Sequence, residues 1–517
     1  MRRTARIIAL CLGAILCMCG CDAPDPQPSP SDTPAPTATA APQAVRFSLG
    51  YDPGASLHPI TGDSQVNQEL TGLVYQGLYE LDNTFTPQPV LARSASVSED
   101  GLVWTISLAA GAVFSDGTPL TAQIAAASLE QARTSPLYAA RLAQVAAVTA
   151  GEDGTVSIFL SAPNGNLSAL LDVPIVLEHE GEGDLHAPLG TGYYRYELAG
   201  DRLYLQPNPY HTASAALPYS TIPLTPASDS AGRIAAFDSG DITAVTTDFS
   251  SPYALGYSSS YETSDYPTTT LLYVGFRASG GPCQSAPVRR AFSMVLDREE
   301  LVRIELSGHG DPSALPVSPL CGDYSETAAA LLAYDTQAAA LLLEEAGYVR
   351  NPEDGLLYRG QNPLEVTLLV NSDNDVRQGI AARMSETLTG LGAAVTVTRL
   401  PWSDFTAALA AGQFDLYIGE VRLPGDFDPS ALITGALNYG GFYSGELTLA
   451  LAQWRSAAGN ARTQAAQALW EEFAQSAPLS PLCFKRGSLL MRWGIASNLQ
   501  PTRANPFYQI ERWTIAG

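Results

Sequence analysis

The sequence predicts an α/β fold in which a mainly parallel sheet is covered by helices. Between Glu365 and Glu420, runs rich in Val, Ile and Leu alternate with segments whose apolar residues recur at helical spacing. We expect strands at 365–370, 394–399 and 415–420, with helices at 376–391 and 403–411. Such β-α-β-α-β alternation is typical of parallel strands, because each connecting helix crosses the sheet before the next strand begins.

Length and composition restrict the classes of function. The chain has 517 residues, 46% of them hydrophobic, and a net charge of −24. At about 150 residues per domain this length predicts roughly three domains or two large lobes. The negative charge repels phosphate, which argues against nucleic-acid binding and against electrostatic adhesion to anionic lipid. The chain has one lysine, Lys485, so lysine-based chemistry has a single candidate.

The N-terminal residues have the features of an export signal. Arg2, Arg3 and Arg6 precede the apolar stretch 7–16. This stretch is too short to span a bilayer, which needs about 20 residues, so we expect a signal peptide over residues 1–20.

The signal region ends in a motif, MCGC at 18–21, that resembles a bacterial lipobox. The resemblance implies that Cys21 is diacylated and becomes the new N-terminus. The protein is then expected to be anchored by lipid on the extracytoplasmic face of the cell membrane. The alternative is plain secretion.

Residues 21–44 are expected to be a disordered linker. Seven of the 23 residues from Asp22 to Ala44 are Pro, and none is aromatic or a large aliphatic. Such a segment buries too little apolar area to fold, and as polyproline II it reaches about 70 Å. A lipid anchor followed by a stiff spacer would hold the folded part of the chain near a membrane surface.

Only three of the seven cysteines, Cys283, Cys321 and Cys483, lie in the foldable part of the chain. Sparse cysteines in an exported chain argue against a disulfide scaffold. Two interpretations of Cys283 and Cys321 stay open. They form a disulfide in an oxidising compartment, or they are small buried hydrophobic residues.

Further elements are expected from local patterns. Thr121 and Asp335 are placed to cap helices, and Gly347 to end one. The remaining strands are expected at 45–50, 102–108, 155–160 and 270–276. The remaining helices are expected at 65–79, 122–132, 287–303, 336–346, 444–457 and 460–474.

The sequence lacks the common catalytic motifs. It contains no HExxH, GxSxG, GxxxxGK[ST] or paired CxxC pattern, so we expect no enzyme, and an exported hydrolase is the least favoured alternative. The run EHEGEGDLH at 178–186 contains metal-ligating side chains, but its glycines favour a solvated loop. We therefore expect no metal site and no cofactor.

Several segments, in order along the chain, resemble the bacterial extracellular solute-binding proteins of family 5, the peptide-binding components of ABC importers. They are LTGLVYQGLYELDNTFTPQPVLARSASVSEDGLVWTISLAAGAVFSDGTPLTAQ (70–123), LGTGYYRYEL (189–198), APVRRAFSMVLDREELVRIELSGHG (286–310), YDTQAAALLLEEAGY (334–348), and PGDFDPSALIT with LNYGGFYSGELTLAL (within 424–451). The resemblance extends over essentially all of residues 46–515.

The resemblance implies a two-lobed clamp of the periplasmic-binding-protein type (type II-like) with a third, inserted subdomain. Lobe I is expected to combine residues 45–80, 174–270 and 484–517. The insert is expected at 81–173 and lobe II at 271–483. Crossovers near Thr270 and Cys483 would form the hinge, with the ligand bound between the lobes.

The resemblance also suggests ligand-binding residues. In peptide-binding members, an Asp at the position of Asp426 pairs with the α-ammonium group of the peptide. Asp426 follows the carboxyl end of an expected parallel strand, where ligands bind in α/β sheets. Its alternative role is to stabilise the loop as an Asx turn, the role that we expect for Asp428.

Other candidates surround this motif. Arg422 is expected either to meet the carboxylate of a peptide or to brace Asp426. Trp402 stacks on a ligand side chain or packs in the core. Three more aromatic residues are candidates for lining side-chain pockets: Phe427, Tyr439 and Tyr443.

The function implied by the resemblance is peptide capture outside the membrane and delivery to an ABC permease with its ATPase subunits. We expect a monomer that contacts the membrane only through its lipid and binds no nucleic acid. The alternatives are nickel-chelate, sugar or haem binding in the same fold. A sensor that presents peptide to a signalling receptor is the alternative of another class.

Overall fold

The computed structural model describes residues 47–179, 187–250 and 256–515. The predicted signal peptide, the predicted lipidation site Cys21, the predicted Pro-rich linker and most of the acidic run at 178–186 lie outside these residues. Within the described residues, no helix is long and apolar enough to cross a membrane.

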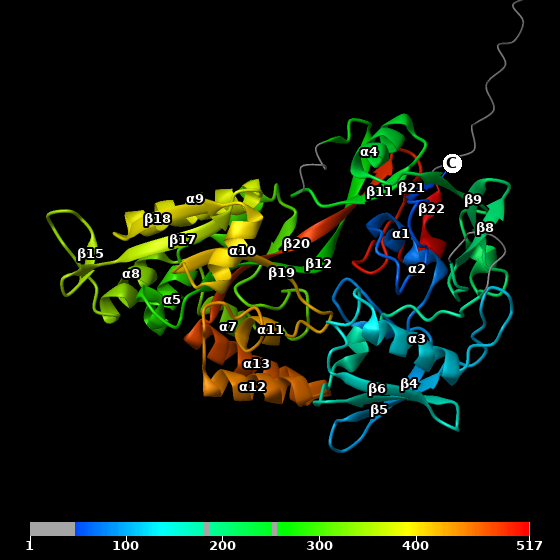
Figure 1. Cartoon of the computed structure of the whole chain (residues 1–517), viewed down its shortest axis with the longest axis horizontal. Coiled ribbons are helices and arrows are strands. Elements are labelled where there is room, and N and C mark those ends of the chain that lie inside the picture. The colour runs from blue at the N-terminus through cyan, green and yellow to red at the C-terminus, as the bar shows by residue number, and fades with distance from the viewer. Residues whose placement is uncertain (1–46, 180–186, 251–255, 516–517) are drawn as a thin grey trace, which may run out of the picture. The chain divides into compact units, whose positions relative to one another are not determined.

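The largest sheet contains the predicted parallel unit (Figure 1). Its strands are ordered β11-β20-β12-β19-β17-β18, and a short strand, β13, also pairs with β20. β17 runs parallel to both β18 and β19, which confirms the β-α-β-α-β prediction. The bounds are β11 Ala244–Thr247, β20 Leu479–Arg492, β12 Tyr261–Phe276, β19 Leu416–Arg422, β17 Glu365–Asn371, β18 Ala394–Leu400 and β13 Gly310–Pro312.

Helices cover both faces of this sheet. Along β17, Leu368 belongs to one hydrophobic core and Leu369 to another, because successive side chains of a strand point to opposite faces. α9 (Asp375–Gly390) packs into the core of Leu368. α10 (Trp402–Ala410) packs into the core of Leu369. The two crossover helices therefore lie on opposite faces.

The other helices of this part of the chain also contribute to the two cores. Their bounds are α5 Ala286–Ser293, α6 Arg298–Glu305, α7 Glu326–Ala330, α8 Thr336–Glu345, α11 Ser430–Ile433, α12 Gly445–Ser456 and α13 Gly459–Ser476. A small sheet is formed by β14 Val349–Arg350, β15 Leu357–Arg359 and β16 Asn362–Pro363.

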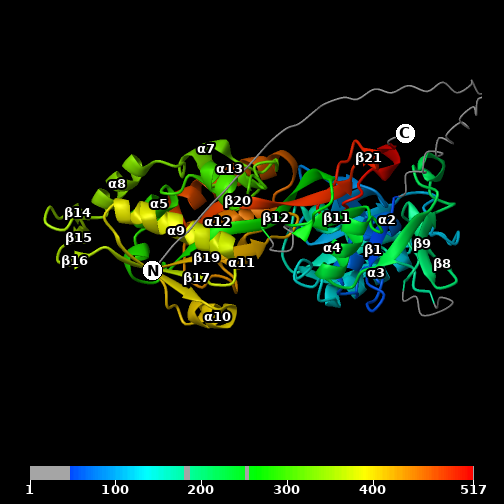
Figure 2. The ribbon, with the colours of Figure 1, turned by 90° about the horizontal axis from the view of Figure 1, so that it is seen from above.

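β12 and β20 are long antiparallel strands that run between the residues predicted as lobe I and those predicted as lobe II (Figures 1 and 2). The names lobe I, insert and lobe II are kept below for the predicted ranges. The C-terminal part of β20 contributes Leu489 and Met491 to the core of lobe I. Its N-terminal part contributes Leu479 and Phe484 to a core of lobe II. The pairing shifts register between Pro267 and Leu271, and again between Leu272 and Tyr273.

Lobe I contains a four-stranded sheet in the order β1-β10-β9-β8, and the insert contains another in the order β4-β5-β7-β6. One hydrophobic core runs through both, from Phe47 to Trp513, so the insert is packed onto lobe I rather than built around a core of its own. The bounds are β1 Leu49–Tyr51, β10 Ile222–Pro226, β9 Arg202–Pro207, β8 Tyr194–Ala199, α4 Ser230–Ser239, β4 Ala92–Val97, β5 Val103–Leu108, α3 Ala122–Thr134, β6 Val145–Ala150, β7 Thr155–Leu160 and η1 Leu167–Leu170. Shorter strands are β2 Tyr79–Leu81, β3 Pro87–Pro89, β21 Ala496–Ser497 and β22 Thr514–Ile515.

The predicted helix caps are confirmed. The Thr121 side chain accepts a hydrogen bond from the backbone N–H of Ile124 at the start of α3. Asp335 accepts from Gln337 and Ala338, both at 2.9 Å, at the start of α8. Gly347 follows α8 with φ 87°, a conformation that favours glycine.

Two predicted helices are each divided in two. The segment 65–79 forms α1 (Gln65–Glu69) and α2 (Thr71–Val74), and then turns extended at Tyr75 before β2 begins. The segment 287–303 contains α5 and α6, because Asp297 leaves the helical conformation and caps α6 through the N–H of Glu300. The predicted strand 270–276 starts earlier, at Tyr261, because it continues its pairing with β20.

Of the two interpretations left open for Cys283 and Cys321, the structure contradicts the disulfide. Both residues are free cysteines. Cys283 is fully buried in the core of α9, whereas Cys321 packs against the core of α10, on the other face of the sheet. Burial raises the pKa of the Cys321 thiol to about 11. Both cysteines pack as small hydrophobic residues, Cys283 fully buried and Cys321 partly buried.

Candidate ligand-binding site

Charged side chains gather where the parallel strands end. Glu420, near the end of β19, lies 3.2 Å from Arg377 Nη2 of α9 and 3.8 Å from Lys485 Nζ of β20. Lys485 also lies 2.5 Å from Asp248 Oδ2 in the segment after β11. This network joins a segment of lobe I to two elements of lobe II, at the edge of the sheet where α/β proteins bind ligands.

Asp426 lies in the loop after β19 and is 5% exposed. Asn164 Nδ2 donates a hydrogen bond to its Oδ2 at 3.0 Å, and the N–H of Asp428 donates one to its Oδ1 at 3.3 Å. Burial and the charge of Asp428 raise the pKa of Asp426 to about 6, opposed by the bond from Asn164. No cationic side chain within the described residues forms an ion pair with it, so this buried carboxylate has neutral donors only.

Asp428 has different partners from Asp426. Its carboxylate accepts a hydrogen bond from the N–H of Ser430 at 2.9 Å, as expected for a turn. It also lies 3.2 Å from Arg455 Nε and accepts from Gln144 at 3.4 Å. The structure thus pairs Asp428 with a cation and leaves Asp426 without one.

The surroundings of Asp426 are a junction between the insert and lobe II. The N–H of Gly165 donates to the carbonyl of Arg455, at the end of α12, at 2.7 Å. The rings of Phe85 and Phe427 meet edge to face with centroids 4.7 Å apart. Asn164 comes from the same insert segment as Gly165. The insert therefore supplies one of the two donors that hold Asp426.

The predicted aromatic residues lie in different environments. Phe427 is fully buried, and its side chain packs in the lobe II core between Phe85 and Phe484. Its backbone has φ 57°. Tyr443 is 88% exposed. Tyr439 is 36% exposed, with its ring edge to face against Tyr417.

Trp402 and Arg422 are both exposed. Trp402 is 55% exposed, stacks on Phe405 and lies 5.7 Å from the guanidinium of Arg377. It connects the surface of α10 to the charged network at the strand ends. Arg422 is the last residue of β19, and it forms no ion pair with Asp426. The structure therefore does not support the interpretation of Arg422 as a brace for Asp426.

Sequence reasoning missed several buried polar residues. Asn164 and Asp426 are 262 positions apart, and no motif connects them. Arg141, Asp172 and Arg503 form an ion-pair group from three distant segments. Such contacts leave no local signal in a single sequence, because each residue alone resembles an ordinary surface arginine or carboxylate.

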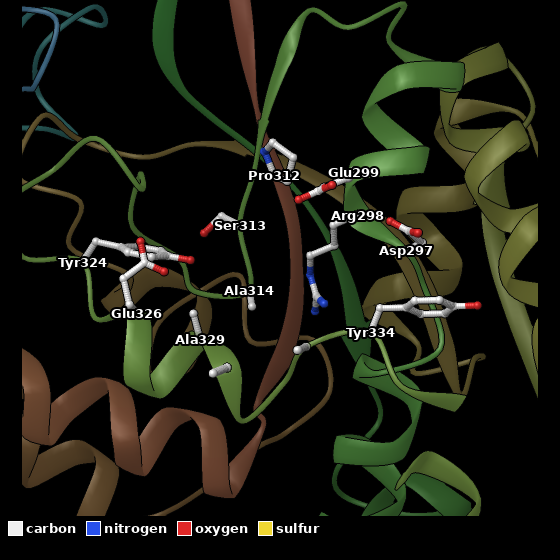
Figure 3. Close-up of a pocket in the computed structure, with 12 residues that line it drawn as sticks. Asp297, Arg298, Glu299, Pro312, Ser313, Ala314, Tyr324, Glu326, Ala329 and Tyr334 are labelled. Carbon is white, nitrogen blue, oxygen red and sulfur yellow. The ribbon is translucent and has the colours of Figure 1, made fainter. Parts of the chain in front are cut away.

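A pocket of about 470 Å³ lies elsewhere in lobe II, around Arg298 (Figure 3). Figure 3 shows Arg298 pointing between Ala314 and Tyr334. Its guanidinium donates to the carbonyls of Pro481, Leu332 and Ser293 at 2.8 to 3.0 Å, and burial lowers its pKa to about 10. These bonds hold three segments together, so Arg298 has a structural role, and none of the predicted ligand-binding residues lines this pocket.

Among the described residues, no group of three or more His, Cys, Asp or Glu side chains is arranged to hold a metal ion.

Comparison with known proteins supports a binding fold. The family model "Bacterial extracellular solute-binding proteins, family 5 Middle" matches residues 86–443. The oligopeptide-binding protein AppA of Bacillus subtilis (strain 168) is 23% identical over 490 residues, which cover 87% of each chain.

Two solved structures illustrate the fold. The MppA periplasmic murein tripeptide binding protein, in its unliganded open form, has a TM-score of 0.73 at 20% identity, with 91% of this chain and 97% of that chain covered. NikA from Brucella suis, in complex with Fe(III)-EDTA, has a TM-score of 0.66 at 19% identity, with 91% and 99% covered. At these identities the likeness shows the fold and leaves the ligand open.

Proposed function

The chain belongs to the bacterial extracellular solute-binding proteins of family 5, which serve ABC importers, and on that premise we propose that it captures peptides and delivers them to an ABC permease. The peptide would bind between the lobes, with its α-ammonium group on Asp426. The α-ammonium is the one charge that all unmodified peptides share at this end, so a carboxylate that binds it is indifferent to side chains.

The observation that carries the proposal is the environment of Asp426. A buried carboxylate is usually paired with a cation, because removing a charge from water is unfavourable. Asp426 has hydrogen bonds from Asn164 and from the N–H of Asp428 but forms no ion pair among the described residues. Burial, together with the charge of Asp428, raises its pKa to about 6. An ammonium group supplied by a ligand would complete the pair.

Calorimetry with free and N-acetylated tri- to pentapeptides tests this role. Acetylation removes the ammonium charge, and Asp426→Asn removes the carboxylate charge while keeping the size of the side chain. Loss of either charge is expected to weaken binding by about 2–4 kcal/mol, or roughly 30- to 1000-fold. The variant should also discriminate less between free and acetylated peptides. Equal affinity of the wild type for both forms would place the anchor elsewhere.

We further propose that the protein is held at the membrane through lipid on Cys21 and acts as a monomer without catalytic activity. The basis is the lipobox-like end of the signal region, followed by the Pro-rich segment. Cys21→Ser should move the protein from the membrane fraction to the soluble fraction. A variant that still sediments with membranes, together with a wild type that carries no acyl mass, would contradict the lipid anchor.

A carboxylate-bearing metal chelate is the second candidate ligand. The NikA neighbour was solved with Fe(III)-EDTA. Because the described residues lack a metal-ligating cluster, a metal would be held here through the carboxylates of its chelator. The observation that favours this candidate is the partly buried pair of Arg141 and Arg503, which share the single carboxylate of Asp172.

A further inference from the structure

Asn164 is a buried amide of the insert that bonds directly to the proposed ligand anchor. It is 2% exposed, and its Nδ2 donates a hydrogen bond to Asp426 Oδ2 at 3.0 Å. The other carboxylate oxygen, Oδ1, accepts from the backbone N–H of Asp428 at 3.3 Å. The carboxylate is therefore held at both oxygens, by one donor from its own loop and by one donor from the insert.

The orientation of the Asn164 amide is fixed by its second bond. Its Oδ1 accepts a hydrogen bond from the backbone N–H of Asn166 at 2.9 Å, which forms an Asx turn. A backbone N–H donates only to the oxygen of an amide side chain, so this bond distinguishes the oxygen from the nitrogen. The atom that faces Asp426 is therefore the donor Nδ2.

Two close backbone contacts keep these two loops at a fixed separation. A Cβ atom on Gly165 would lie 2.0 Å from the carbonyl oxygen of Ala457, at the end of α12. A Cβ atom on Gly425 would lie 2.4 Å from the carbonyl oxygen of Ala169, in η1. Each loop thus has a glycine where it meets the other side of the junction, and only a residue without a side chain allows so close an approach.

The bonds that hold Asp426 leave capacity for a cation. An ionised carboxylate accepts about four hydrogen bonds, and two are made within the described part of the chain. Both donors are neutral, so the negative charge remains available to an ammonium group, which carries three donors of its own.

Burial is the largest cause of the raised pKa of Asp426, about 6, and the charge of Asp428 adds to it. The bond from Asn164 is the largest opposing contribution, ahead of the Asp428 N–H and the charge of Arg462. The Cys321 thiol, on which the charge of Asp426 acts, stays uncharged at neutral pH because burial raises the pKa of the thiol to about 11. Among these contacts, the insert therefore does most to keep the anchor ionised.

The other charged groups around Asp426 are engaged in ion pairs of their own. Asp428 pairs with Arg455 of α12 at 3.2 Å, and Arg462 of α13 pairs with Asp323 at 2.7 Å. Each of these charges is opposed by a partner, so the Asn164 bond is the contact of Asp426 that a single substitution can remove without leaving a new charge unpaired.

We propose that Asn164 is a positioning residue of the ligand site, which orients the Asp426 carboxylate toward a ligand ammonium group and makes the insert part of ligand recognition. The inference rests on the proposed function, since it assigns the group that holds the anchor. A hydrogen bond to the charged form of a carboxylate favours that form. Because the insert shares its core with lobe I, the bond also couples the anchor in lobe II to lobe I.

Calorimetry on the full chain tests this role by comparing Asn164→Ser with the wild type at pH 5.5 and 7.5. Serine still accepts the N–H of Asn166 in a turn, but its side chain is one atom shorter and lacks the Nδ2 donor. Without that donor, the pKa of Asp426 should rise by about 1 or more. Apparent affinity falls with the fraction of protein that is competent to bind, here the ionised fraction. Trialanine binding should therefore weaken about 10-fold at pH 5.5 and about twofold or less at pH 7.5.

The pH dependence separates positioning from a structural role. A substitution that merely loosened the junction would weaken trialanine by the same factor at both pH values. Titration of the peptide's own ammonium group cancels, because both proteins bind the same peptide. Carbon-13 NMR of the Asp426 carboxyl, assigned by its absence from Asp426→Asn, measures the change of its pKa directly and needs no ligand.

Asn166→Ala is the matched control on the same loop. The Asn166 side chain forms no hydrogen bond with the described residues, and its backbone N–H is kept in the variant. This change should leave trialanine affinity within about twofold at both pH values. Asn164→Gln keeps an amide but displaces it by one methylene, so it should show a smaller loss with the same pH dependence. It keeps the test valid if Asn164→Ser does not fold.

The outcomes separate this inference from the peptide function, with N-acetyl trialanine and n-butylamine as further probes. If acetylation weakens binding but Asn164→Ser has equal effects at both pH values, the positioning role is rejected while the anchor stands. If no peptide binds but n-butylamine binds with a pH dependence that Asn164→Ser alters, the positioning role stands and the peptide function fails. If acetylation leaves trialanine affinity unchanged, or no amine-bearing probe binds the wild type, the positioning role is rejected together with the anchor.

Discussion

At the residue scale, the protonation of Asp426 links stability to pH. Its pKa in the folded protein is about 6, against an ordinary value of 3.8, because burial disfavours the charged form. Between these two values the folded state binds the proton more tightly than the unfolded state. The free energy of unfolding therefore falls as pH rises through this window, and the ionised carboxylate costs about 3 kcal/mol above it.

Asp426→Asn should consequently be more stable than the wild type at pH 8. The amide removes the buried charge but offers one oxygen where the carboxylate offers two, so it loses one of the bonds from Asn164 and Asp428. The expected net gain is about 1–2 kcal/mol at pH 8 and close to zero at pH 4. Urea unfolding of both proteins from pH 4 to 8 measures the difference.

That comparison also cancels a second contribution of the same sign. Glu80 has a pKa raised to about 7, chiefly by burial, and it too makes the wild type less stable as pH rises. Because Glu80 is present in both proteins, only the difference between them reports on Asp426. A difference that does not change with pH would contradict the raised pKa.

At the element scale, the loop between β7 and η1 docks closely on the end of α12. A Cβ atom on Gly165 would lie 2.0 Å from the carbonyl oxygen of Ala457, which is shorter than any normal contact. Gly165→Ala should force the two segments apart and lower the free energy of unfolding by about 1–3 kcal/mol. The hydrogen bond between Gly165 and Arg455 would be lost, so amide hydrogen exchange in 161–166 should speed up.

Gly445 provides the matched control for that change. It is the first residue of α12, and a Cβ atom there would meet open space. Gly445→Ala should leave stability unchanged or raise it by up to about 1 kcal/mol, because alanine favours the helix. Equal effects of the two substitutions in urea unfolding would show that the docking of this loop contributes nothing.

Elements with local signals could be predicted from the sequence, and those that depend on distant partners could not. Thr121 and Asp335 act within their own helix turns, so the cap and the helix are visible together. The start of β12 at Tyr261 depends on pairing with β20, more than 200 residues later in the sequence. No local sequence pattern indicates this start. The partners of Asp426 were missed for the same reason, although its strand-end position was evident.

At the scale of the whole molecule, the parallel unit followed from periodicity, whereas the two-lobed arrangement came only through the family resemblance. Composition and alternation indicate how many elements there are, but they do not say which core each element joins. The domain boundaries near Thr270 and Cys483 stay a prediction. The register shifts of β12 between Pro267 and Tyr273 support that prediction, because broken pairing is where two strands bend most easily.

The single lysine offers a direct test of lobe closure. Lys485 is 8% exposed along its side chain, and it pairs with Asp248 from lobe I and approaches Glu420 from lobe II. If the lobes separate around the β12–β20 connection, this amine becomes accessible to reductive methylation. At a ligand concentration of 100 Kd the open, unliganded population falls by up to about 100-fold. We therefore expect trialanine at that concentration to slow modification of Lys485 about 10-fold or more.

Mass spectrometry can assign the product without ambiguity, because the α-amino group is the only other amine. N-acetyl trialanine, which should bind poorly, is the matched control and should leave the rate nearly unchanged. An unaltered rate in the presence of a peptide that demonstrably binds would mean that closure does not protect this lysine, and that the charged network does not report on the arrangement of the lobes.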